Sequence, residues 1–175
     1  MKIHLIRHTK VNVENGVCYG QKDVDLADTF EQEAEVVKSK LKDINFKKAY
    51  SSPLSRCKKL AEFITEEITF DDRLLELNFG DWEGKEWEAI NDPNLDKWFN
   101  DFINRKCSNG ESFVMLKERV LDFLEYVKNQ SEQEIVIFTH AGVIRTIYSH
   151  LNNISLQDAF AKASVDYGEI NTFEL

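Results

Sequence analysis

The sequence has few of the residues and patterns that mark several classes of protein. Its 175 residues include three cysteines and two prolines, and no apolar run approaches the roughly 18 residues of a membrane span. Three cysteines without C-x-x-C spacing argue against a disulfide framework or a zinc cluster, so we expect a reduced, cytoplasmic setting. The first residues are MKIHLIRH, in which charged residues recur before an apolar segment of sufficient length can form. The N-terminus therefore does not resemble a signal peptide.

Positive charge is also scarce. The formal net charge is −9, from 22 Lys and Arg against 31 Asp and Glu. An acidic chain has no general affinity for nucleic acid or for an anionic membrane, so we expect neither as a partner. An anionic ligand would have to be held by a few cations gathered in one place, and the position of each arginine is therefore informative.

The chain shows no internal repeat, no low-complexity tract and no linker, which predicts one domain over residues 1–175. Short apolar segments predict strands at 2–6, 47–51, 134–139 and 168–175. Helices are expected at 30–41, 52–67, 94–104, 112–130 and 140–152, with Ser52 as N-cap and Pro53 as first residue of the second. Alternating strands and helices predict an α/β fold, a three-layer α/β/α sandwich with a mainly parallel central sheet.

Two histidines follow predicted strands directly. His8 comes after the first strand, and His140 comes after EIVIFT, the most apolar strand of the chain. In open α/β sheets, ligands bind in the crevice beyond the carboxyl ends of the strands. We therefore expect these two histidines to meet although they are far apart in sequence.

Two arginines are expected in the same pocket. Arg7 precedes His8, and Arg56 lies near the start of the helix that follows another strand. The backbone amides behind Ala141 and Gly142, at the start of a further helix, add N–H donors. Two guanidiniums with bidentate geometry, next to a helix N-terminus, suit a phosphate group.

Phosphoryl transfer also needs a nucleophile and a proton for the leaving oxygen. The sequence has no P-loop, serine elbow or acidic metal cluster, whereas a neutral imidazole can attack phosphorus directly and nearby arginines favour its neutral form. His8 fits this role. A carboxyl group from a neighbouring loop, Glu76 or Glu83, would supply the proton, because a bound phosphate raises the pKa of a nearby carboxyl.

Four segments together resemble the motifs of a known family. They occur in the family's order and span nearly the whole chain: LIRHT, SSPLSRCKKLAE, LLELNFGDWEG and FTHAGVIR. The chain thus resembles the histidine phosphatase superfamily, with its phosphoglycerate mutase-like fold. The resemblance implies that His8 becomes a transient phosphohistidine while Arg7, Arg56 and His140 hold the phosphoryl oxygens. It also implies Glu76 as the proton donor, and no metal or other cofactor.

The sequence departs from the family's motifs at two positions. Thr9 replaces the family's usual glycine after the histidine, and Glu14 replaces an asparagine that contacts substrate in many members. Both weaken the case for a sugar-phosphate mutase more than the case for a phosphatase. Within the superfamily, four segments are most similar to α-ribazole phosphatases of cobalamin assembly: GVCYGQKDVDLADTF, LLELNFGDWEGKEW, NGESF and VDYGEI.

Three further residues are candidates for the substrate side of the pocket. The resemblance places Gly20 and Gln21 there, although a loop glycine more often serves only a turn. Trp82 adjoins the loop that carries Glu76, and this role is weighed against core packing, the commoner one for an aromatic residue.

The leading hypothesis is a phosphomonoesterase that forms a phosphohistidine and acts on α-ribazole 5′-phosphate, a small phosphorylated metabolite. A phosphatase of broad specificity and a phosphoglycerate mutase are the alternatives in the same chemistry, and the short span between Glu76 and His140 argues against the mutase. A phosphate- or protein-binding module without catalysis is the alternative from another class. Retention of all five pocket residues argues against the module.

Overall fold

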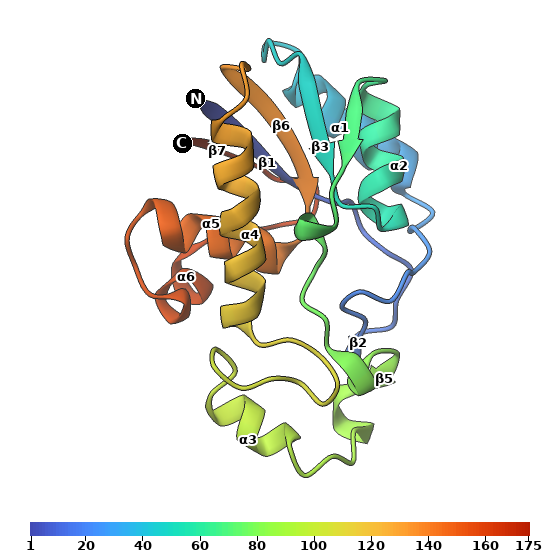
Figure 1. Cartoon of the computed structure of the whole chain (residues 1–175). Coiled ribbons are helices and arrows are strands. Elements are labelled where there is room, and N and C mark those ends of the chain that lie inside the picture. The colour runs from blue at the N-terminus through green and yellow to red at the C-terminus, as the bar shows by residue number, and fades with distance from the viewer.

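A five-stranded sheet forms the centre of the protein, in a computed structural model that describes residues 1–175 (Figure 1). The strand order is β4 (Ile68–Phe70), β3 (Lys48–Ser51), β6 (Glu134–Thr139), β1 (Lys2–Arg7) and β7 (Ile170–Glu174). The first four strands are parallel, and β7 runs antiparallel to β1 at the edge. The predicted α/β class with a mainly parallel sheet is therefore confirmed.

Helices cover both faces of this sheet. Alternation along β1 sends Ile3 and Leu5 to one face and Ile6 to the other, so two separate cores form. The larger core lies beneath α4 (Phe113–Lys128) and α5 (Ala141–Leu151), and α6 (Leu156–Lys162) packs on α5. The smaller lies beneath α1 (Phe30–Lys40) and α2 (Ser55–Ile64). None of these helices has the length and apolar character that crossing a membrane requires.

A smaller region lies beyond the carboxyl ends of the parallel strands (Figure 1). It contains the antiparallel pair of β2 (Val17–Cys18) and β5 (Lys85–Glu86), two 3-10 turns and α3 (Leu95–Asn100). The turns are Gly80–Trp82 and Trp87–Ala89, whereas a third, Asp72–Leu74, packs against α4 at the edge of the sheet. Trp82, Trp87 and Trp98 pack against one another and hold this region together.

Three sequence-based boundaries need correction. The α2 helix begins at Ser55 with Leu54 as its N-cap, because the hydroxyl of Ser52 contacts the Nε2 atom of His140 at 2.8 Å instead of capping the helix. The helix expected over 94–104 ends at Asn100, where the next residue leaves helical geometry. The short α6 was not predicted, although Ser155 caps it by accepting a hydrogen bond from the Asp158 amide.

Candidate active site

The register of two central strands brings the two predicted histidines together. β1 and β6 are parallel neighbours in which Arg7 pairs with Thr139, so the next residue of each strand lies at the same edge. The His8 amide donates to the Thr139 carbonyl at 3.1 Å. The imidazole rings of His8 and His140 lie 5.3 Å apart between centroids. One site is thus built from residues that are far apart in sequence.

The environment of His8 leaves one ring nitrogen with a free lone pair. Its side chain is almost fully buried, and Nδ1 lies 2.7 Å from the Thr9 carbonyl oxygen. A carbonyl only accepts, so Nδ1 carries the hydrogen and Nε2 keeps its lone pair. Burial and the nearby Arg56 charge hold the pKa of His8 well below its usual value, although the Thr9 contact opposes this. His8 is therefore a neutral imidazole at neutral pH.

His140 is held by two polar neighbours. Nε of Arg56 donates to Nδ1 of His140 at 3.3 Å, which leaves the hydrogen on Nε2. That hydrogen is directed at the Ser52 hydroxyl, 2.8 Å away. Burial, Arg56 and His8 lower the pKa of His140 well below its usual value. The second histidine is therefore also neutral and fixed in one tautomer.

Two guanidiniums supply the positive charge of the site. Arg56 is fully buried and donates to the carbonyls of Lys22 at 3.0 Å and Gly20 at 2.5 Å, and each terminal nitrogen retains a second N–H. Arg7 donates to the Val165 carbonyl at 2.7 Å. Neither arginine forms an ion pair with a carboxylate. A buried guanidinium beside a half-buried one, both without an ionic partner, suits an anionic ligand even in a chain of net negative charge.

The carboxylate of Glu76 lies at the start of α5, beside His140. Its two oxygens accept from the Leu77 amide at 2.9 Å and from the Gly142 amide at 3.2 Å. A Cβ at Gly142 would collide with Oε1 of Glu76, so this close approach depends on glycine. The Ala141 amide makes no hydrogen bond within the chain. Of the two amides predicted to face an anion, Ala141 remains available while Gly142 bonds to Glu76.

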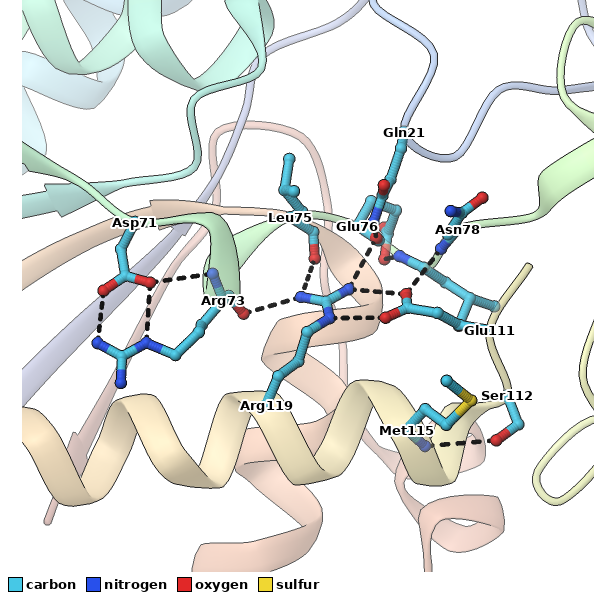
Figure 2. Close-up of polar contacts among 11 residues, drawn as sticks. Gln21, Asp71, Arg73, Leu75, Glu76, Asn78, Glu111, Ser112, Met115 and Arg119 are labelled. Carbon is cyan, nitrogen blue, oxygen red and sulfur yellow. Dashed lines mark hydrogen bonds and ion pairs between the residues drawn. The ribbon is translucent and has the colours of Figure 1, made fainter. Parts of the chain in front are cut away.

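The backbone of Glu76 is held by Arg119 of α4, a residue that the sequence analysis missed (Figure 2). Nη1 of Arg119 donates to the carbonyls of Arg73 at 2.8 Å and Leu75 at 2.7 Å, and Nη2 donates to the carbonyl of Glu76 at 2.9 Å. The same guanidinium forms a two-point ion pair with Glu111, at 2.9 and 3.0 Å. Arg119 thus fixes the segment from which the Glu76 side chain projects.

Glu83, the other candidate for the proton donor, has a carboxylate that binds backbone amides of two loops. Oε1 of Glu83 accepts from the amides of Gln21 at 2.8 Å and Phe79 at 2.9 Å, so it joins two loops. The Gln21 side chain donates to the Glu76 carbonyl at 2.9 Å. Gly20 has a φ of +42° and presents its carbonyl to Arg56. Gly20 and Gln21 therefore lie beside the predicted catalytic residues and help to position them.

Trp82 does not lie on the substrate side, and that prediction is corrected. Its side chain is fully buried among Trp87 and Trp98, and its indole nitrogen donates to Asp92 at 2.7 Å. No face of the ring is left for a ligand. Core packing, the alternative weighed in the sequence analysis, is its role.

Two tyrosines that the sequence analysis did not select cover the site. The Tyr167 ring lies 5.5 Å from the His8 ring and 3.8 Å from the guanidinium carbon of Arg7. The Tyr19 ring lies 5.1 Å from the guanidinium carbon of Arg56. The two hydroxyls are 3.4 Å apart, which joins segments separated by 148 residues. The tyrosines thus cover both arginines with aromatic faces.

The two buried histidines are expected to make stability depend on pH. An unfolded histidine binds a proton near pH 6.5, whereas the lowered pKa values of His8 and His140 keep both neutral in the folded state. The unfolded chain therefore binds more protons below about pH 6.5, and the free energy of unfolding falls as the pH falls from there towards the folded-state pKa values. We expect His8→Asn to reduce this loss between about pH 7 and pH 5.5 by on the order of 1 kcal/mol.

Denaturant unfolding at both pH values measures this effect. His150→Asn, at an exposed position, is the matched control and should lose as much stability as the wild type. Equal losses in the His8 variant and the wild type would mean that His8 is protonated as readily in the folded chain as in the unfolded one.

Comparisons with known proteins agree with this geometry. The sequence matches the family described as the histidine phosphatase superfamily (branch 1) over residues 3–175. A putative phosphoserine phosphatase 2 of Hydrogenobacter thermophilus is 28% identical over 165 residues, which cover 90% of this chain and 81% of that protein. A probable phosphoglycerate mutase GpmB of Escherichia coli is 31% identical over 153 residues, covering 82% and 70% respectively.

Solved structures share the fold. The α-ribazole phosphatase from Shigella flexneri superimposes with a TM-score of 0.90 at 24% identity, covering 100% of this chain and 91% of that one. The sheet order and the flanking helices are those of the phosphoglycerate mutase-like fold, as the resemblance implied. The family match covers nearly every residue, including both histidine segments. The chain belongs to branch 1 of the histidine phosphatase superfamily, a family of metal-independent phosphatases and mutases.

Proposed function

We propose that this protein hydrolyses phosphomonoesters through a phosphohistidine formed on His8. The observation that carries the proposal is the state of this side chain: a buried, neutral imidazole whose Nε2 lone pair is available beside the two unpaired arginines. A neutral imidazole is a competent nucleophile, and the cations offset the charge of the phosphoryl group.

The proposed reaction has two displacements at phosphorus. Nε2 of His8 attacks, the bond to the leaving oxygen breaks, and the Glu76 carboxyl gives that oxygen its proton. The Glu76 carboxylate then takes a proton from water, which attacks the phosphohistidine, releases inorganic phosphate and restores His8. Arg7 and Arg56 hold the phosphoryl oxygens throughout.

Two further donors complete the proposed phosphoryl site. His140 can turn its Nε2 hydrogen from the Ser52 hydroxyl to a phosphoryl oxygen, and the Ala141 amide adds a donor at the start of α5. Each of these groups is fixed by the ends of β6 and α5, so the site needs little rearrangement to bind phosphate.

We propose α-ribazole 5′-phosphate as the substrate. Support comes from the motifs shared with α-ribazole phosphatases, including the loops that carry Tyr19 and Tyr167. Phosphoserine is the second candidate, because two Hydrogenobacter thermophilus relatives, 28% and 27% identical, bear the names of phosphoserine phosphatases. The two candidates differ in the alcohol that leaves, which is an uncharged nucleoside in one and a zwitterionic amino acid in the other.

A substrate panel tests the proposal. Phosphate release is measured with an aryl phosphate, α-ribazole 5′-phosphate, phosphoserine and 3-phosphoglycerate, each with and without a chelator. We expect release that a chelator does not affect, and a kcat/KM for α-ribazole 5′-phosphate at least about tenfold above that for phosphoserine.

The other outcomes separate the alternatives. A higher kcat/KM for phosphoserine than for α-ribazole 5′-phosphate would contradict only the proposed substrate. Interconversion of phosphoglycerates without net phosphate release would indicate a mutase. No release from any of the four esters would contradict the phosphatase proposal itself and favour a binding module.

A further inference from the structure

A cavity of about 450 Å³ shares two residues with the active site. Tyr19 and Tyr167 line it, and the same two rings contact His8, Arg7 and Arg56 on their other sides. Its volume lies within the usual range of small-molecule sites. The cavity is therefore placed to hold the part of a substrate that extends away from the phosphoryl group.

Three side chains of the active site are closed off from solvent. His8 is 1% exposed, and Arg56 and His140 are 0% exposed. The contact that links the two covering rings is the one between the tyrosine hydroxyls, at 3.4 Å, which is long for a hydrogen bond between hydroxyls. Tyr167 is 37% exposed and precedes Gly168 at a φ of +65°.

Part of the wall of the cavity is apolar. Besides the two tyrosines, its apolar lining consists of Val11, Val13, Val17 and Ala27. Aliphatic and aromatic surfaces of this kind gain free energy by covering an apolar ligand, and tyrosine rings also stack on planar groups.

The charges in the cavity oppose an anionic ligand. Lys10 is the one cation in the lining, and its ammonium lies 3.8 Å from the Glu33 carboxylate. Glu14 lines the cavity with a carboxylate of its own. A carboxylate on the leaving group would meet Glu14 and find its nearest cation already paired.

We infer that this cavity is the leaving-group subsite and that it selects uncharged, apolar alcohols over alcohols bearing a carboxylate. The inference rests on the proposed phosphatase function and narrows its substrate class. The tyrosine pair separates to admit the phosphoryl group, and the released alcohol remains in the cavity between Tyr19, Tyr167 and the valines.

Benzyl phosphate and 3-phosphoglycerate test this selection, because both are esters of primary alcohols, only 3-phosphoglycerate carries a carboxylate, and neither carries an ammonium group. We expect wild-type kcat/KM to be at least about tenfold higher for benzyl phosphate. Glu14→Lys should lower the KM for 3-phosphoglycerate at least about fivefold and leave the KM for benzyl phosphate within about twofold. Glu118→Lys, at an exposed position on α4, makes the same change in net charge and should leave both substrates unaffected.

A second variant tests the apolar wall without turnover. Benzylphosphonate cannot be hydrolysed, and calorimetry gives its Kd in the wild type, in Val13→Asp and in the surface control Val114→Asp. We expect Val13→Asp alone to raise the Kd at least about fivefold. The proposed subsite would be contradicted by an unchanged Kd in Val13→Asp. It would also be contradicted if Glu14→Lys left the ratio of the two KM values unchanged. If the wild type binds benzylphosphonate in this manner but hydrolyses neither ester, the phosphatase proposal fails and the subsite stands.

Discussion

A His8→Asn variant is expected to release phosphate from an aryl phosphate at least about 10³-fold more slowly than the wild type, since removing a nucleophile typically costs this much or more. The asparagine amide can still donate to the Thr9 carbonyl, which the histidine now does through Nδ1. The substitution therefore removes the attacking nitrogen while keeping the local hydrogen bond. Initial rates at saturating substrate measure the loss.

His150→Asn is the control for this experiment. It makes the same substitution at an exposed position in the last turn of α5 and should retain full activity. Thermal unfolding of both variants checks that each is folded at the assay temperature. A folded His8→Asn protein with more than about a tenth of the wild-type rate would rule out His8 as the nucleophile.

An Arg119→Met variant is expected to lose both stability and activity. The substitution leaves the carbonyls of Arg73 and Leu75 without their donor, removes one of the two donors to the Glu76 carbonyl, and leaves the Glu111 carboxylate without its ionic partner. Breaking a largely buried ion pair costs about 3–5 kcal/mol, and the two side chains here are only 19% and 17% exposed. Because the Glu76 backbone loses its support, we expect kcat to fall about 10- to 100-fold with a smaller change in KM.

The double variant Arg119→Met with Glu111→Gln separates the two effects. Removing the stranded charge should recover part of the stability, whereas kcat should stay low because the segment that carries Glu76 still lacks the hydrogen bonds from Arg119. Lys117→Met, on the same helix but without an ion pair, is the matched control and should behave as the wild type. A folded Arg119→Met protein with wild-type kcat would show that Arg119 supports the fold and does not position Glu76.

The sequence was sufficient to predict the strand ends that carry the site. The apolar segments ending at Arg7 and Thr139 are buried parallel neighbours, so the two histidines that follow them had to lie at one edge. Arg56 was placed correctly although its helix begins two residues later than expected. The periodicity of apolar residues predicts the strands, and the common direction of parallel strands predicts that their carboxyl ends lie together. The two signals therefore place residues that are far apart in the sequence.

Contacts to backbone carbonyls were not predictable in the same way. Arg119 acts on the carbonyl oxygens of a loop, and no sequence pattern records which carbonyls a guanidinium will reach. One signal was present, because Arg119 lies three residues after Leu116 and four before Phe123, on the apolar face of α4. An arginine that falls on the buried face of a helix needs partners inside the protein for its charge. A position of this kind in the sequence therefore indicates a structural or functional role.

The tyrosine cover was missed for a similar reason. Tyr19 and Tyr167 lie in loops, and their contacts with Arg56 and Arg7 depend on how those loops fold over the sheet edge. Trp82 was assigned to the substrate side because of its place in the sequence, yet its neighbours in space are the other tryptophans. The positions of side chains in loops could therefore be found only from the structure, whereas the positions of residues at strand ends could be predicted from the sequence.

Identification of the phosphorylated residue tests the central claim most directly. A Glu76→Gln variant lacks the group proposed to activate water, but an aryl phosphate has a leaving group good enough to phosphorylate it without an acid. After mixing and quenching in base, peptide mapping should find the phosphoryl group on His8 of most chains. A phosphoryl group on another residue, or full turnover by this variant with His8 unmodified, would contradict the account.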